Sequence, residues 1–218
     1  MAGAWELMQD KQVLVGILHV DTTCMAWSLG LRNLQIPGRI CPVAGMPYDM
    51  ARNTICDIAL REGYRYVFMM DSDVIPPNDA ILRLIRHNKP IISGVYHRRS
   101  PPVGIPVMQK GGQWVTSYPA NAIIEVDVVG AGCLLIRRDV LEKLPPIRPG
   151  HRWFDWKVNY NGLPGQNRPG MSEDFEFCYQ CRQNGIPILV DTSVQARHIG
   201  LGQATYGRFE SCDTTTIT

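Results

Sequence analysis

Long hydrophobic runs are missing from this chain of 218 residues. The longest uninterrupted apolar stretch, residues 128–136, is far shorter than the roughly 20 residues that a membrane-spanning helix needs. The N-terminal sequence MAGAWELMQDK has neither the basic nor the apolar region of a secretory signal peptide. We therefore expect no membrane segment and a cytoplasmic location, which for a viral protein would be the host cytoplasm.

A strong excess of charge of one sign is also missing. The chain has 22 Lys and Arg against 20 Asp and Glu, a net charge of +2, whereas nucleic-acid binders usually carry a large basic excess. The local basic cluster His97-Arg98-Arg99 is either a solvated turn or a contact for a phosphate or an acceptor. Hydrophobic residues at 45% and charged residues at 19% are typical of an ordinary globular protein.

Paired cysteine spacings are scarce. The seven cysteines are an odd number, and Cys178 and Cys181 form a C-x-x-C within a helical pattern that has no second pair to complete a zinc site. We interpret these two as thiols of the core or of a helix face. Together with the N-terminus, this pattern favours a reducing compartment.

Strand and helix patterns alternate through the first hundred residues. Apolar, β-branched runs predict strands at 12–19, 40–43, 66–70 and 91–95, and helical spacing predicts helices at 24–34, 49–62 and 78–87. Asp49 is placed to cap the second helix and Gly63 to end it. This alternation predicts right-handed βαβ units and a mostly parallel sheet, whose ligands bind beyond the carboxyl ends of the strands.

The second half of the chain has a different pattern. Residues 100–113 and 145–170 are rich in Pro and Gly and predict long loops, which are usually functional or mobile. Between and after them we expect strands at 123–129, 133–137 and 188–190 and helices at 139–144 and 172–184. Ser172 would cap the last helix, and Gly185 would end it.

The stretch FMMDSDVIPP, residues 68–77, runs from an apolar strand into two carboxylates. Residues i and i+2 of a strand share one face, so Asp71 and Asp73 would lie side by side and repel unless a cation or a proton intervenes. Two carboxylates at the mouth of a parallel sheet can hold Mg²⁺ or Mn²⁺. The alternative is that both aspartates merely cap the next helix.

Two further features can carry chemistry. Glu173 and Asp174 open the last helix, where carboxylates suit the helix dipole, but beside an aromatic, Gly-rich loop one of them can act as a general base. His198 is either structural or a metal ligand, and an imidazole ligand would favour Mn²⁺ over Mg²⁺.

Four motifs in this order resemble the GT-A fold glycosyltransferases, especially the small stand-alone, family-2-like members of microbes and viruses. They are GMPYDMARNTICDIALREGYRYVFMMDSDV, DSDVIPP, VDVVGAGCLLIRRDVLEKL and MSEDFEFCYQCRQNGIPILVDTSVQARHIG. The resemblance covers residues 12–200. It implies one α/β domain over 1–218, with a Rossmann-like nucleotide-sugar-binding half at 12–99, an acceptor-side half with mixed strands at 100–200 and a tail at 201–218.

The resemblance also implies an activity, the transfer of a sugar from a nucleoside diphosphate sugar, UDP- or GDP-linked, to a hydroxyl of a carbohydrate or other acceptor. Asp73 would bind the Mn²⁺ or Mg²⁺ that bridges the diphosphate, Asp71 would contact the ribose or share the metal, and His198 would complete the metal site. Asp174 would be the base of an inverting transfer, with Glu173 in reserve and near the acceptor. Further donor contacts would come from Ser72, Asp49, Arg52, Gly130, Ala131 and Gly132, and Trp153 would contact the acceptor.

Other interpretations stay open. The stretch His19-Val20-Asp21-Thr22-Thr23 lacks the usual family-2 pattern for gripping the base, so the donor base is open. A haloacid-dehalogenase-like phosphatase would use Asp71 as nucleophile and Asp73 as acid and base, although the required downstream lysine has no clear match. A non-catalytic nucleotide-sugar-binding module is the third interpretation. A nucleic-acid acceptor is also possible within the transferase interpretation, but the net charge of +2 does not support it.

Overall fold

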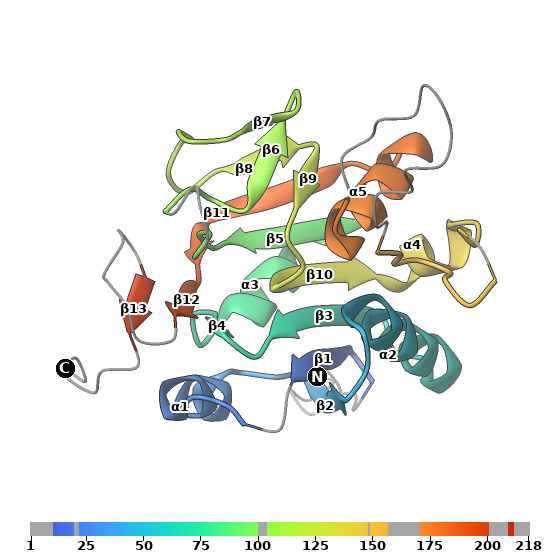
Figure 1. Ribbon diagram of the computed structural model, residues 1–218, viewed down its shortest axis with the longest axis horizontal. Helices are drawn as coiled ribbons and strands as arrows, with labels where there is room; N and C mark the ends of the chain where they lie inside the picture. Colours follow the sequence, from blue (N-terminus) through green and yellow to red (C-terminus); the bar gives the residue numbers. More distant parts are fainter. Residues whose placement is uncertain are drawn as a thin grey trace, which may run out of the picture.

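A seven-stranded sheet forms the centre of the protein in the computed structural model, which describes residues 11–19, 22–99, 104–147, 149–156 and 171–200 and the backbone of 209–211. From the bottom to the top of Figure 1 the order is β2-β1-β3-β10-β5-β11-β8. The strands are β1 (Val13–His19), β2 (Gly38–Ala44), β3 (Tyr66–Asp71), β5 (Ile91–Val95), β8 (Ile123–Val126), β10 (Cys133–Arg137) and β11 (Ile188–Gln195). Strands β8 and β10 run antiparallel to the others, so the sheet is mostly parallel, with mixed pairing in its second half, as predicted.

Helices cover both faces of the sheet. They are α1 (Met25–Asn33), α2 (Tyr48–Glu62), α3 (Ala80–Arg86), α4 (Arg138–Lys143) and α5 (Glu173–Gln183). Alternate residues of β1 supply the two cores, because successive strand residues point to opposite faces. Leu14 packs in one core with residues of α2, α4 and α5, and Val15 packs in the other with residues of α1 and α3.

Two small sheets lie at the edge of this body. One joins β4 (Val74–Ile75), β12 (Arg197–Gly200) and β13 (Phe209–Ser211), and the other joins β6 (Met108–Lys110), β7 (Gln113–Trp114) and β9 (Val128–Val129). The antiparallel pairing of β12 with β4 places His198 opposite Val74, next to Asp73 in the chain. A pairing between segments so distant in the sequence brings the C-terminal histidine to the Asp71-Ser72-Asp73 stretch.

Several predicted boundaries differ from the structure. The predicted loop at 100–113 contains β6 and β7, the predicted strand at 123–129 is two strands that join different sheets, and the last strand continues to Gln195. Residues 100–103, 148, 157–170, 201–208 and 212–218 of the predicted loops and tail lie outside the described residues.

The ends of α2 and α5 depart from the capping prediction in part. Helix α2 begins at Tyr48 with Pro47 in the N-cap position, so the prediction that Asp49 caps it is wrong, and Asp49 lies in the first turn. Gly63 ends α2 with a φ of 85°, a left-handed conformation that glycine adopts at little cost. Ser172 does occupy the N-cap position of α5, but its hydroxyl donates to the Asp174 carboxylate instead of capping the backbone.

Most of the described cysteines are free thiols in the core. Cys41, Cys56, Cys133, Cys178 and Cys181 are free and buried, which confirms Cys178 and Cys181 as core thiols. Cys24 is disulfide-bonded, which the expectation of a reducing compartment did not predict. Among the described residues, none of the helices combines the length and the hydropathy required to cross a membrane.

Candidate functional site

The Asp71-Ser72-Asp73 stretch separates two groups of polar side chains. Strand β3 ends at Asp71, and Ser72 and Asp73 form a turn before β4, so the alternation of the strand stops between the two carboxylates. Asp71 pairs with Arg52 and Asp73 pairs with Arg99, each at an exposed fraction near three tenths. The expectation of two carboxylates side by side on one strand face is therefore wrong, and each carboxylate is paired with an arginine of its own.

Arg52 of α2 is the centre of the first group. Its Nε lies 3.0 Å from Oε1 of Glu173, its Nη2 lies 3.0 Å from Oδ1 of Asp71, and its side chain is 3% exposed. Its Nη1 is buried without a hydrogen-bond partner among the described residues. A buried guanidinium is stable only when it is paired, so Arg52 ties α2 to the end of β3 and the start of α5.

Three carboxylates share this guanidinium. Burial alone would lower the pKa of Arg52, but the charges of Asp71, Glu173 and Asp174 outweigh it and raise that pKa above its ordinary value. Burial raises the pKa of Glu173, and repulsion from Asp174 adds to the rise. Burial also raises the pKa of Asp174, against the attraction of Arg52. A carboxylate with a raised pKa is a stronger base than an ordinary one.

Asp174 is held in place by the chain around it. Its Oδ2 accepts a hydrogen bond from the backbone N–H of Ala131 at 3.3 Å, and its Oδ1 accepts from the N–H of Phe175 at 2.8 Å and from the Ser172 hydroxyl. The first bond links α5 to the turn between β9 and β10. The predicted base thus has a fixed orientation against that turn.

Glycine is required in this turn by the protein itself. A Cβ on Gly130 would collide with the hydroxyl of Tyr96, and a Cβ on Gly132 would lie 2.9 Å from Oδ2 of Asp71. The N–H of Gly132 donates to the Tyr96 hydroxyl at 3.1 Å, and burial raises the pKa of Tyr96 well above its ordinary value, with repulsion from Asp71 and Asp174 adding to the rise. The family resemblance implies that these glycines contact the donor. The structure gives a sufficient reason in the packing of Tyr96 and Asp71.

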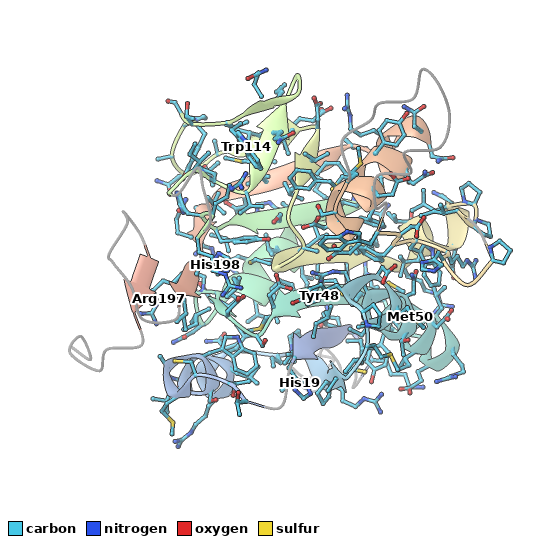
Figure 2. The ribbon with its side chains drawn as sticks, viewed as in Figure 1. His19, Tyr48, Met50, Trp114, Arg197 and His198 are labelled. Atoms are coloured by element: carbon cyan, nitrogen blue, oxygen red, sulfur yellow. The ribbon has the colours of Figure 1, made fainter. Side chains whose placement is uncertain are left out.

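The second group joins Asp73, His198 and Arg99. Asp73 Oδ2 lies 2.6 Å from Nη1 of Arg99, and Asp73 Oδ1 lies 3.4 Å from Nε2 of His198. His198 sits where β12 meets β4 (Figure 2). Burial alone would raise the pKa of Asp73, but His198 and Arg99 lower it below its ordinary value, so this side chain is a carboxylate at neutral pH.

The second ring nitrogen of His198 has a fixed role. Its Nδ1 lies 2.7 Å from the backbone oxygen of His97, and since a carbonyl oxygen only accepts, Nδ1 carries a proton. In the neutral imidazole Nε2 then turns its lone pair toward the Asp73 carboxylate. Two such acceptors face one another stably only with a proton or a cation between them.

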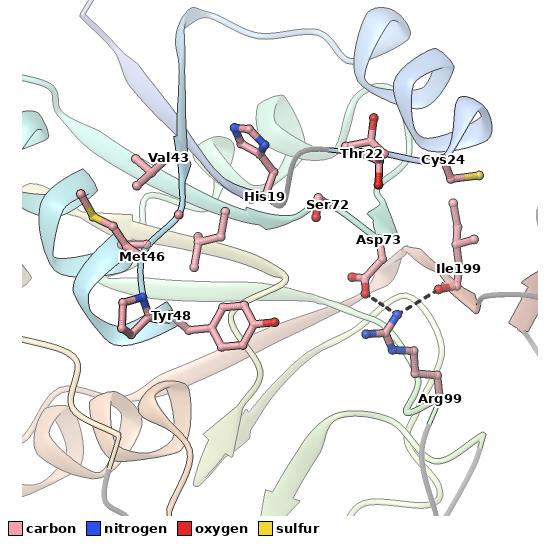
Figure 3. A pocket seen from close by; sticks show the side chains of 15 residues that line it. His19, Thr22, Cys24, Val43, Met46, Tyr48, Ser72, Asp73, Arg99 and Ile199 are labelled. Carbon is pink, nitrogen blue, oxygen red and sulfur yellow. Dashed lines mark hydrogen bonds and ion pairs between the residues drawn. The ribbon is translucent and has the colours of Figure 1, made fainter.

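A hollow of about 510 Å³ opens beside this group. Its lining includes His19 at the end of β1, Tyr48 at the start of α2, and Ser72, Asp73 and Arg99 (Figure 3). It lies beyond the carboxyl ends of β1 and β2, where open α/β sheets bind their ligands. Its volume is in the range of small-molecule sites, roughly 300–1,000 Å³.

The predicted acceptor contact does not fit the structure. Trp153 is 1% exposed and its Nε1 donates to the backbone oxygen of Leu141 at 2.8 Å, so it belongs to the core. The exposed tryptophan is Trp156, at 46%, and its ring centre lies 6.3 Å from that of Tyr48. The Pro- and Gly-rich loop therefore does present an aromatic side chain, but it is a different one.

Asp49 belongs to another cluster. Its carboxylate accepts from the N–H groups of Met50 at 2.8 Å and Trp156 at 3.3 Å, and it lies with His151 and Asp155 in a group whose potential metal-ligating atoms are all within 4.8 Å of one another. Neither Asp49 nor Arg52 lines the hollow. This cluster uses none of the residues of the Asp73 and His198 group.

Some site residues had weak signals in the sequence. Arg99 belongs to the basic cluster that the sequence did indicate as a possible phosphate contact. His151 and Asp155 lie four apart in a segment without helical pattern, and Tyr96 lies in a strand-to-loop junction, so nothing in their spacing marked them.

Comparisons with known proteins agree with this architecture. No family model and no curated protein matches the sequence. The structure is similar to that of A197 from STIV, with a TM-score of 0.59 and 16% identity over 86% of this chain and 85% of that one. It is also similar to GalNAc-T7 crystallised with UDP, GalNAc and Mn²⁺, with a TM-score of 0.58 and 10% identity over 88% of this chain. The match spans only 44% of the GalNAc-T7 chain. At these identities the likeness concerns the fold, and this protein has the GT-A fold.

Proposed function

We propose that this protein is a metal-dependent glycosyltransferase that uses a nucleoside diphosphate sugar as donor. The observation that carries the proposal is the Asp73 carboxylate facing Nε2 of His198 at 3.4 Å, at the edge of the hollow. Two ligands about 2.1 Å from one metal ion, at angles of about 90–110°, lie about 3.0–3.4 Å apart. The two residues therefore fit a divalent cation, and the imidazole favours Mn²⁺ over Mg²⁺.

Such a cation, when bound, would stabilise the charge that develops on the leaving nucleoside diphosphate. Arg99, 47% exposed and in contact with Asp73, lines the same hollow and is placed to contact a phosphate. Ser72 also lines it, and Asp71 lies one residue further back as a second donor contact. We propose that the turn at Gly130, Ala131 and Gly132 lies near the donor sugar.

Asp174 is proposed as the base that takes the proton of the acceptor hydroxyl in an inverting transfer. Its raised pKa and fixed orientation support this role, and Glu173 is less suitable because Arg52 binds it. For the acceptor we propose the exposed pair Tyr48 and Trp156 in place of Trp153. An aromatic pair at the rim suits the apolar face of a sugar ring better than a charged acceptor such as nucleic acid.

Arg52 and Asp49 are not proposed as nucleotide contacts, because both are buried against partners of their own. The phosphatase interpretation is also not retained. Its nucleophile would be Asp71, whose Oδ1 is bound by a buried guanidinium, and the fold is that of GT-A proteins. A non-catalytic sugar-nucleotide-binding module shares the fold and differs only in turnover.

Thermal unfolding with UDP or GDP, each with and without Mn²⁺ or Mg²⁺, tests the proposal. Ligand at about 100 times its Kd stabilises the folded state by about 2.7 kcal/mol, which raises the Tm by several degrees. We expect one nucleotide to stabilise the protein more with metal than without, and Asp73→Asn to remove that difference. Equal stabilisation with and without metal would exclude the metal bridge. Binding without hydrolysis or transfer of the sugar nucleotide would indicate the binding module.

A further inference from the structure

A cluster of one histidine and two aspartates lies at the start of α2, apart from the proposed donor site. Nδ1 of His151 is 3.2 Å from Oδ2 of Asp49 and 3.2 Å from Oδ1 of Asp155. The side chains are 15%, 9% and 6% exposed, in that order. Asp49 comes from the first turn of α2, and the other two come from the segment that follows α4.

The imidazole nitrogen makes no hydrogen bond to either carboxylate. His151 Nδ1 is buried and has no hydrogen-bond partner among the described residues, although both oxygens are near enough. Neither oxygen therefore lies along the direction in which Nδ1 points. The separations of 3.2 Å match those of two ligands bound about 2.0–2.1 Å from one tetrahedral metal ion, about 3.3 Å.

Two buried carboxylates this close require a positive charge between them. The guanidinium of Arg52, one turn further along α2, is paired with Asp71 and Glu173, and that of Arg152 lies 4.7 Å above the ring centre of Trp153. At the position of Nδ1, beside Oδ2 of Asp49 and Oδ1 of Asp155, a positive charge comes from a protonated His151 or from a bound cation. An imidazolium would aim its Nδ1–H at one of the two oxygens.

We propose that Asp49, His151 and Asp155 form a structural metal site for a transition-type divalent cation of the Zn²⁺ class. One nitrogen and two carboxylate oxygens suit Zn²⁺ better than Ca²⁺ or Mg²⁺, which take oxygen ligands. A surface hollow lined by Asn53, Asp57, Pro146 and His151 opens beside the cluster and gives a cation an entry path. The proposal does not depend on the donor or on the transfer reaction.

The site joins two segments that carry the exposed aromatic pair. Tyr48 precedes Asp49 and Trp156 follows Asp155, so an ion at the cluster fixes the backbone beside both rings. Tyr48 lies at the start of α2, facing the hollow (Figures 2 and 3). Metal at this site would therefore hold Trp156 against Tyr48 at the rim.

Equilibrium dialysis of chelator-treated protein against Zn²⁺, without nucleotide, tests the site. The measurement uses Asp73→Ala, which disables the proposed donor metal site, so that any remaining ion is counted alone. We expect one Zn²⁺ per chain, lost in the Asp73→Ala/His151→Ala double variant. The affinity loss should exceed the roughly 10–100-fold that removal of an outer-shell partner costs. The fluorescence of Trp156 should change when Zn²⁺ is added, with the same Zn²⁺ affinity as in the dialysis. Trp156→Phe is the reference that identifies the signal of this residue.

His87→Ala in the same background is the matched control, because Nε2 of His87 contacts a single carboxylate, Asp191, at 2.9 Å. It should keep the ion. No ion bound to Asp73→Ala, or an ion retained after His151→Ala, overturns the proposal. If His151→Ala does not fold, the nitrogen NMR signal of His151 Nδ1 in the Asp73→Ala protein replaces that comparison. A signal that remains that of an imidazolium when Zn²⁺ is added shows that His151 forms an ion pair only, and this result also overturns the proposal.

Discussion

Nε2 of His198 faces the Asp73 carboxylate at 3.4 Å while Nδ1 of the same ring donates to the backbone oxygen of His97 at 2.7 Å. The backbone thus selects the neutral tautomer whose Nε2 lone pair faces the Asp73 carboxylate, the arrangement in which the two groups can share a cation. We predict that His198→Ala lowers the affinity for UDP with Mn²⁺ by at least 10-fold and leaves the weak metal-free binding unchanged. Calorimetric titration measures both. His87→Ala, which removes another histidine–aspartate pair, should change neither.

Asp174→Asn should lower the rate of sugar transfer by roughly 10²–10⁴-fold, the usual cost of losing a general base. Donor affinity should hardly change, because Asp174 faces the turn at Ala131 and does not line the hollow. Glu173→Gln is the comparison, since that carboxylate is bound by Arg52. A larger loss of rate in Glu173→Gln than in Asp174→Asn would exchange the two roles. Retention of the donor's anomeric configuration in the product would reduce Asp174 to a residue that positions the acceptor.

The pH dependence follows from the raised pKa of Asp174. A base works only when ionised, so kcat should rise with pH through a pKa above the ordinary 3.8 of an aspartate. Above 3.8 and up to the raised value, the folded state binds more protons than the unfolded state, so the free energy of unfolding should fall as pH rises through this window. Urea unfolding at several pH values measures the slope. The slope should be smaller in an Asp174→Asn/Glu173→Gln variant, and an unchanged slope would contradict the assignment.

Arg52→Met should destabilise the protein strongly, by roughly 3–5 kcal/mol, the cost of leaving buried carboxylates without their partner. Chemical denaturation at neutral pH gives the difference. Arg52→Met combined with Glu173→Gln should recover part of the loss, because fewer buried charges then lack compensation. Arg39→Met is the control. Arg39 forms an exposed pair with Glu62, and its loss should leave the unfolding midpoint nearly unchanged.

Trp153 and Trp156 should respond oppositely to replacement by alanine. Trp153→Ala removes a core side chain and should cost about 3–5 kcal/mol of stability. Trp156→Ala removes an exposed ring and should leave the Tm unchanged but raise KM for the acceptor. Thermal unfolding and initial rates on both variants separate the two effects. An unchanged KM in Trp156→Ala would remove the aromatic pair from the acceptor site.

The apolar runs and the helical spacing allowed most elements of the central sheet to be predicted, because burial on two faces leaves a strong local pattern. Where pairing between distant segments decides, the sequence pattern was insufficient. The short strands β4 and β12 form by pairing with one another, although they lie far apart in the sequence. Strands β6 and β7 lie in a segment whose prolines and glycines indicated a loop. Local capping preference likewise placed Asp49 at the helix start, but the chain enters α2 through Pro47.

The candidate site was predictable in its residue types and less so in its connections. Asp73 and His198 do come together, as the motif order indicated, and Asp174 does lie near the turn at Ala131. The burial of Arg52 among three carboxylates depends on how α2 packs against α5, which no spacing reveals. The prediction chose Trp153 as the exposed acceptor contact, but the exposed residue is Trp156. The two tryptophans lie three residues apart in an irregular segment, where no periodicity distinguishes the buried side chain from the exposed one.

The most direct test of the proposed metal site at Asp73 and His198 is the position of Mn²⁺ in crystals of the protein grown with UDP and MnCl₂, located by anomalous scattering at the manganese edge. We expect a peak within coordination distance of Asp73 and of Nε2 of His198, in contact with the diphosphate. A UDP diphosphate bound in the hollow with no manganese at Asp73 and His198, or a manganese peak found only at Asp49, His151 and Asp155, would contradict it.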